Sequence, residues 1–151
     1  MRPKYGEILL LVWSVISTQN VFALDDHIQI KHGWVRLAPP NASVLAGYCT
    51  LENHANQSIE LVSVQSPLFE SVEIHRTEIN AGSSRMQRLE RLEIKARQSV
   101  RFSPNGLHLM LIAPKQKITM DSKIPIRFNF LGQERTVEFI VRRELAQETL
   151  P

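Results

Sequence analysis

The chain has 151 residues, of which 43% are hydrophobic and 22% are charged, and its formal net charge is +3 at pH 7. This composition suits one globular domain with a sizeable core and excludes a disordered chain. The small positive charge gives no argument for nucleic-acid binding. Cys49 is the only cysteine, which excludes an intramolecular disulfide, and its apolar surroundings predict a small buried side chain.

The first 23 residues have the pattern of a secretory signal peptide. Arg2 and Lys4 precede an apolar run over residues 8–16, and Val-Phe-Ala at 21–23 provides a cleavage site. The alternative is a membrane anchor, but the apolar run is too short to span a bilayer. We therefore predict export to the periplasm, cleavage after Ala23, and a mature protein with no membrane-embedded segment.

Beyond residue 24, short apolar or alternating runs are separated by turn residues, with no convincing long amphipathic helix. Such spacing is typical of an all-β sandwich or barrel. A further segment, 86–94, mixes charged residues with leucine at irregular spacing. Gly-Gln at 132–133 predicts a turn that joins the last two strands into a terminal hairpin. We predict one domain over residues 24–141 and a loose C-terminal tail over 142–151. The clearer predicted strands are 28–37, 44–52, 59–64, 72–79, 99–102, 107–112, 124–131 and 135–141.

Two histidines and two methionines in the middle of the chain form a candidate metal site. His75 is followed after ten residues by Met86, then after twenty-one by His108, and Met110 lies two positions further on. His108 and Met110 fall in the predicted strand 107–112, where residues i and i+2 share a face. Thioethers favour Cu(I) and imidazole accepts copper in either oxidation state, so this set selects copper over zinc, magnesium or calcium. Considered alone, each histidine would be interpreted as a hydrogen-bonded side chain and each methionine as a residue that fills a gap in the core. The four residues together, at this spacing, favour the interpretation that they are metal ligands.

The pattern His75-x10-Met86-x21-His108-x-Met110 resembles the signature of the periplasmic copper chaperones of the PCuAC family. The similarity spans residues 28 to 141 and also includes the motifs Gly-Trp-Val-Arg at 33–36, Ala-Pro-Pro at 38–40, Ala-Gly-Tyr at 46–48, Leu-Glu-Asn at 51–53 and Val-Glu-Ile-His at 72–75. The resemblance implies a cupredoxin-like Greek-key β-sandwich or barrel that holds one Cu(I) ion, with Cu(II) as an alternative, through these four side chains.

The resemblance also implies a partner that accepts the copper. The expected recipient is cytochrome c oxidase subunit II or another copper assembly factor, and a recipient with thiolates would bind Cu(I) more strongly than thioethers do. Six arginines lie between His75 and His108 and form either a basic rim for an acidic partner or an ordinary solvated face interrupted by glutamates. They are Arg76, Arg85, Arg88, Arg91, Arg97 and Arg101.

Other functions stay open at the level of sequence. A periplasmic copper store or scavenger would use the same ligands, and a metal-free secreted β-sandwich that serves as an interaction module would make their spacing a coincidence. A blue-copper electron-transfer site needs a cysteine thiolate, and Cys49 lies outside the ligand cluster. No arrangement of catalytic residues is visible in the sequence, and a metal held by four side chains lacks the open position that catalysis needs. We therefore predict that the protein is not an enzyme.

Overall fold

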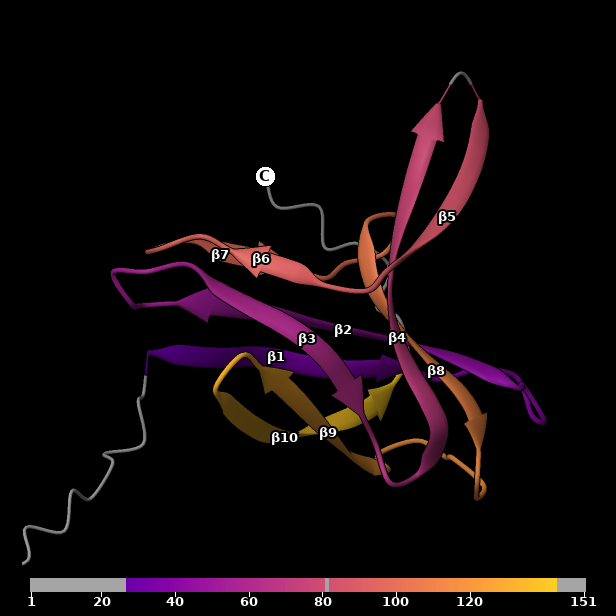
Figure 1. Ribbon diagram of the computed structural model, residues 1–151. Helices are drawn as coiled ribbons and strands as arrows, with labels where there is room; N and C mark the ends of the chain where they lie inside the picture. Colours follow the sequence, from indigo (N-terminus) through magenta and orange to yellow (C-terminus); the bar gives the residue numbers. More distant parts are fainter. Residues whose placement is uncertain (1–26, 81, 144–151) are drawn as a thin grey trace, which may run out of the picture.

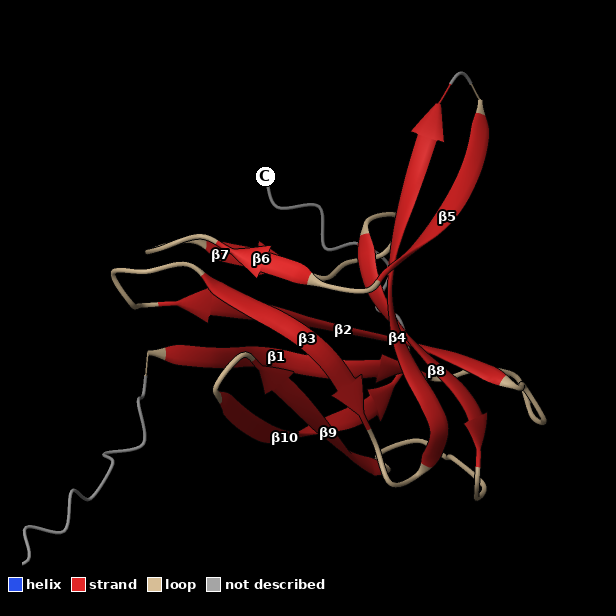
Figure 2. Ribbon diagram, in the orientation of Figure 1, coloured by secondary structure: helices blue, strands red, loops and turns tan. Residues whose placement is uncertain are grey.

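The computed structural model describes residues 27–80 and 82–143, so the predicted signal peptide and residues 144–151 of the predicted tail lie outside the described residues. Within these ranges the chain forms ten strands and no helix (Figure 2). The all-β prediction is confirmed. Accordingly, the described residues contain no helix that could cross a membrane.

Seven of the ten strands close into a barrel. Their order is β4-β8-β2-β1-β10-β9-β3, and β3 pairs back with β4. The first and last strands, β1 and β10, run parallel, whereas their other neighbours in the barrel are antiparallel. In chain order the strands are β1 (Ile28–Arg36), β2 (Val44–Asn53), β3 (Ile59–Gln65), β4 (Phe69–Asn80), β5 (Ser83–Leu89), β6 (Leu92–Ile94), β7 (Ser99–Arg101), β8 (Leu107–Pro114), β9 (Lys123–Phe130) and β10 (Gln133–Arg142).

The remaining three strands pair outside the barrel order. Strand β5 pairs with β4, β6 with β3, and β7 with β2. Figure 1 shows that β4 and β5 continue past the barrel wall as a hairpin that projects away from it. Strand β5 is therefore an edge of the sheet, and nearly all of its side chains are exposed.

The alternating pattern of each barrel strand places one face in a common core. On β9, for example, Ile124, Ile126 and Phe128 are fully buried, while Arg127 between them is exposed. Cys49 belongs to this core, as the sequence predicts, and burial raises the pKa of its thiol. Every second side chain of a barrel strand is buried in this core, and its removal from water explains the alternation of apolar and polar residues in the sequence.

Strand β1 contains an irregularity next to the core. Its register with β2 shifts between Lys31 and Trp34, and His32 has a positive φ of 54°. Gly33 lies at this point, and a Cβ built on it would be 2.5 Å from two ring carbons of Phe139. The ring therefore occupies the space that any other side chain would need.

Candidate metal centre

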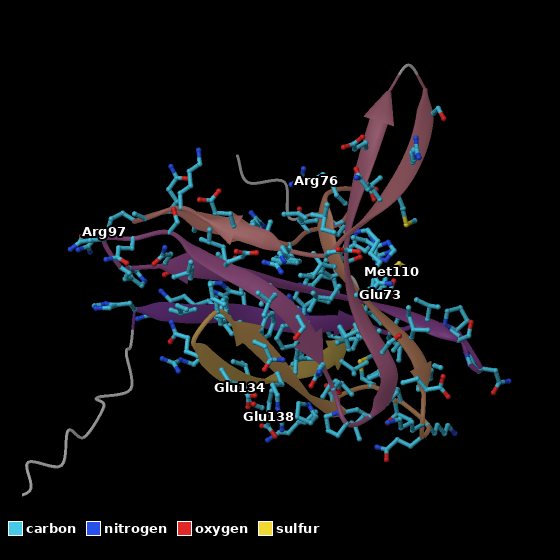
Figure 3. The ribbon with its side chains drawn as sticks, in the orientation of Figure 1. Glu73, Arg76, Arg97, Met110, Glu134 and Glu138 are labelled. Carbon is cyan, nitrogen blue, oxygen red and sulfur yellow. The ribbon has the colours of Figure 1, made fainter. Side chains whose placement is uncertain are left out.

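Strands β4 and β8 bring three of the four predicted ligands together. In their antiparallel register His75 lies opposite His108, and Glu73 lies opposite Met110. Directly opposite residues of an antiparallel pair share a face, and their side chains touch. The two imidazole centroids are 5.9 Å apart, with an angle of 40° between the rings. Figure 3 shows Met110 and Glu73 side by side where β4 passes β8.

The candidate ligands on β8 face away from the hydrophobic core. Leu109 and Leu111 have no exposed surface and point inward, so the alternating residues His108 and Met110 point to the outer face. His108 is nevertheless only 8% exposed. The outer face therefore holds a histidine that is largely sheltered from water.

Met86 lies on the same face but comes from the projecting hairpin. In the β4–β5 register Thr77 is opposite Met86, and His75 is opposite Arg88. Met86 is thus a diagonal neighbour of His75, a relation in which residues lie about 7–8 Å apart. Met86 is 60% exposed. The structure places this thioether beside the histidine pair on an exposed strand, on the opposite side from Met110.

Each histidine is oriented by one hydrogen bond. His108 donates Nδ1–H to the carbonyl oxygen of Gly106 at 3.0 Å, which leaves the lone pair on Nε2. Nε2 of His75 is 2.8 Å from Oε2 of Glu73, and because a carboxylate only accepts, Nε2 carries the proton. The lone pair of His75 is therefore on Nδ1, which is buried and has no hydrogen-bond partner among the described residues.

Glu73 is a residue of the site that the ligand pattern does not reveal. Its second carboxylate oxygen forms an ion pair with Nη1 of Arg88 at 3.0 Å. Glu73 precedes His75 by two positions on the same strand, so it shares the face of the ligand. That spacing is the signal in the sequence that could have found it.

The donor set fits a soft metal ion. Among residues 27–80 and 82–143, no three His, Cys, Asp or Glu side chains are grouped so that they could hold a metal. A metal at this position would therefore need methionine sulfur in addition to His75 and His108. Sulfur from a thioether is a good ligand for Cu(I) and a poor one for hard cations. The orphaned Nδ1 of His75 adds a buried nitrogen that lacks a partner.

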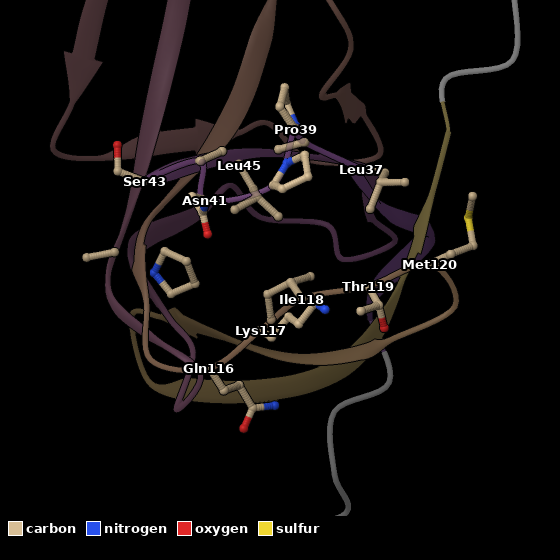
Figure 4. Close-up of a pocket in the computed structure, with 15 residues that line it drawn as sticks. Leu37, Pro39, Asn41, Ser43, Leu45, Gln116, Lys117, Ile118, Thr119 and Met120 are labelled. Atoms are coloured by element: carbon tan, nitrogen blue, oxygen red, sulfur yellow. The ribbon is translucent and has the colours of Figure 1, made fainter.

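A cavity among the described residues lies away from the candidate ligands. A cavity of about 900 Å³ is formed between the β1–β2 and β8–β9 connections and is lined by Leu37, Leu45, Ile118 and Met120 among others (Figure 4). None of the four candidate ligands lines it. The candidate metal centre is thus part of the outer sheet face and separate from this cavity.

The six arginines between the first and third ligands do not form one rim. Arg76 and Arg85 are exposed on the β4–β5 hairpin, and Arg91 pairs with Glu60 at 3.0 Å. Arg97 lies at the far end of the barrel from Met110 (Figure 3). Arg88, also on the hairpin, pairs with Glu73 at the candidate metal centre.

Solved structures with the same fold come from PCuAC domains. The copper-bound PCuAC domain from PmoF2 has a TM-score of 0.66 and 22% sequence identity, and the match covers 78% of this chain and 93% of that domain. The Cu(I) form of DR1885 from Deinococcus radiodurans has a TM-score of 0.63 and 26% identity, and the match covers 77% and 78% of the two chains. The fold thus defines a PCuAC-type, cupredoxin-like β-domain, and the predicted fold and family resemblance are both confirmed.

The family model described as "Putative lipoprotein LpqE-like" matches residues 28–141, and the chain belongs to this family. A relative described as uncharacterized, RP573 of Rickettsia prowazekii, is 33% identical over 86 residues. That match covers 56% of this chain and 48% of RP573, so this chain spans about half the length of that relative.

Proposed function

We propose that this protein binds one copper ion as Cu(I) through His75, Met86, His108 and Met110 and delivers it to another protein. The observation that carries the proposal is the pairing of His75 with His108 on one face of β4 and β8, with Met110 beside them. Two solved proteins with this fold, the copper-bound PCuAC domain from PmoF2 and the Cu(I) form of DR1885, support copper as the metal.

The location proposed for this activity is the periplasm. The family description names lipoproteins, which are exported proteins, and the N-terminal pattern of the sequence is that of a signal peptide. The proposed domain covers residues 24–141 after cleavage. Cys49 would not carry a lipid in the folded protein because it is buried in β2.

The ligand set favours delivery of the metal over its use in catalysis. Neutral thioethers hold Cu(I), yet a recipient that offers cysteine thiolates binds the same soft ion more strongly. Met86 is exposed on the hairpin, so a recipient could replace this ligand first while the sheltered histidines still hold the ion. The proposed recipient is cytochrome c oxidase subunit II or another copper assembly factor.

A Cu(I) competition titration tests the ligand set. The mature protein should bind one equivalent, and Met86→Leu should bind more weakly because leucine keeps the volume and removes the sulfur. Met120→Leu is the matched control, since Met120 is also partly exposed but lines the separate cavity. If Met86→Leu binds as tightly as the wild type, Met86 is not a ligand. If the wild type binds no copper, the protein is instead a metal-free interaction module.

A transfer experiment separates delivery from storage. The Cu(I)-loaded protein is mixed with the apo copper-binding domain of cytochrome c oxidase subunit II, and the copper content of each protein is measured after separation. Delivery predicts that the metal moves to the oxidase domain. Copper that stays on the protein at equilibrium would favour a store or scavenger. Repeating the titration with Cu(II) determines whether the oxidised ion is also held.

A further inference from the structure

Glu73 links a solvent-exposed arginine to one of the candidate ligands. One carboxylate oxygen accepts a hydrogen bond from Nε2–H of His75 at 2.8 Å, and the other forms an ion pair with Nη1 of Arg88 at 3.0 Å. The side chain of Arg88 is 62% exposed, that of Glu73 is 19% exposed, and that of His75 is 14% exposed. The carboxylate is thus held from the solvent side by Arg88 and fixes the imidazole on its inner side.

The hydrogen bond decides which nitrogen of His75 can bind a metal. With the proton on Nε2, the lone pair is on Nδ1, which is buried and has no partner among the described residues. Most buried polar atoms in folded proteins have a partner, because an unpaired one loses its hydration without compensation. His108 has the opposite arrangement, since its Nδ1–H is bound to the carbonyl of Gly106 and its Nε2 has the lone pair.

We propose that Glu73 is a positioning residue that selects Nδ1 of His75 as the copper-binding atom, while Gly106 selects Nε2 of His108. This inference rests on the proposed copper function. Nδ1 of His75 and Nε2 of His108 would then be the two nitrogen atoms that hold the ion. A carboxylate or carbonyl bound to the second nitrogen of a metal-binding histidine fixes the ring and raises its basicity.

In the opposite assignment, Glu73 accepts the hydrogen bond from Nε2 of His75 only in the metal-free protein. Copper then replaces Glu73 at that nitrogen. The two assignments predict a different protonation of one nitrogen atom, which can be measured. Nε2 of His75 keeps its proton in the Cu(I) form if Glu73 is a positioning residue, and it loses the proton if Glu73 is displaced.

Long-range ¹H–¹⁵N spectra of the imidazoles distinguish the assignments. Spectra are recorded on the mature protein at about pH 8, where imidazole is neutral, before and after one equivalent of Cu(I). The metal-free protein should show His75 protonated on Nε2 and His108 protonated on Nδ1. Addition of Cu(I) should shift the signals of His75 Nδ1 and His108 Nε2. A shifted His75 Nε2 that has lost its proton overturns the inference.

Variants of Glu73 provide a second measurement. In Glu73→Ala the tautomer of His75 should no longer be fixed, and the Cu(I) affinity should fall about 10–100-fold. Glu73→Gln keeps an acceptor oxygen and should restore most of the affinity and the wild-type tautomer. If Glu73→Ala retains both the spectrum and the affinity of the wild type, Glu73 has no positioning role.

The chain contains a matched control for these variants. Oε2 of Glu52 accepts from Nε2 of His54 at 3.0 Å and pairs with Nζ of Lys31 at 2.8 Å, so this carboxylate also joins a histidine to a cation, but away from the candidate ligands. The pKa of the Glu52 carboxyl is lowered, with the hydrogen bond from Lys31 as the largest cause. Glu52→Ala should change the spectrum of His54 and leave Cu(I) affinity unchanged.

The outcomes separate this inference from the proposed function. A wild type that binds no Cu(I) overturns both the copper function and the assignment of a copper-binding nitrogen. A wild type that binds Cu(I) through Nε2 of His75 overturns the inference alone.

Discussion

Among the described glycines, Gly33 leaves the least room for an added Cβ. A Cβ at this position would meet the ring of Phe139 at 2.5 Å, and Phe139 is fully buried. We expect Gly33→Ala to lower the free energy of unfolding by about 1–3 kcal/mol, the usual cost of overpacking. Urea denaturation measures this change.

A double mutant provides the control for Gly33→Ala. Phe139→Leu removes the ring that the new methyl group would meet, so Gly33→Ala should cost less in that background than in the wild type. Equal costs in the two backgrounds would show that contact with Phe139 is not the reason glycine is needed.

Cys49 should be chemically inert in the folded protein. Burial raises the pKa of its thiol, and the thiolate is the form that reacts with alkylating agents. We expect iodoacetamide to leave the native protein unlabelled at pH 8 and to label it in urea, as measured by intact mass. Rapid labelling of the native protein would contradict the buried placement of Cys49.

The candidate ligands and the residues that bind their second nitrogen atoms differ in how far the sequence could predict them. His75 and His108 could be chosen as candidate ligands because imidazole and thioether side chains at this spacing are chemically specific. The period of two along a strand then placed His108 and Met110 on one face. For Glu73 the sequence offers only its spacing of two residues from His75, which is a weak signal because a glutamate in a strand is ordinarily a solvated side chain. Its role depends on a hydrogen bond that exists only after folding.

At the scale of elements, hydrophobic alternation predicted the barrel strands but not the hairpin. The predicted segment 107–112 lies within β8 (Leu107–Pro114), and 44–52 lies within β2 (Val44–Asn53). Segment 86–94 was irregular because it contains the end of β5, a break and then β6. Strand β5 is exposed on both faces, so its strand conformation depends on pairing with β4 and leaves no period in the sequence.

The β4–β5 hairpin leads to a prediction about hydrogen exchange. Because β5 is an edge strand whose only pairing partner among the described strands is β4, its amides should exchange with solvent readily in the metal-free protein. Binding of Cu(I) by Met86 would link β5 to the histidine pair and slow this exchange. Hydrogen exchange with mass spectrometry should show added protection in β5 and little change in β9 (Lys123–Phe130). Equal protection of β5 with and without Cu(I) would argue against Met86 as a ligand.

At the scale of the whole molecule, the proposed export sets the residue at which the mature chain begins. Residues 1–26 lie outside the described structure, so cleavage after Ala23 is tested only by experiment. Intact-mass measurement of protein recovered from the periplasm should show a chain that begins at Leu24. Recovery from the cytoplasm of protein that retains Met1 would contradict the proposal.

The parallel pairing of β1 with β10 has a consequence for the order of folding. The barrel closes only when β10 takes its place between β1 and β9, and β10 is the last strand of the described chain. Loops that join distant parts of a chain form late because their closure entropy must be overcome first. The barrel thus stays open until β10 is available, which is compatible with the proposed export of the chain in an unfolded state.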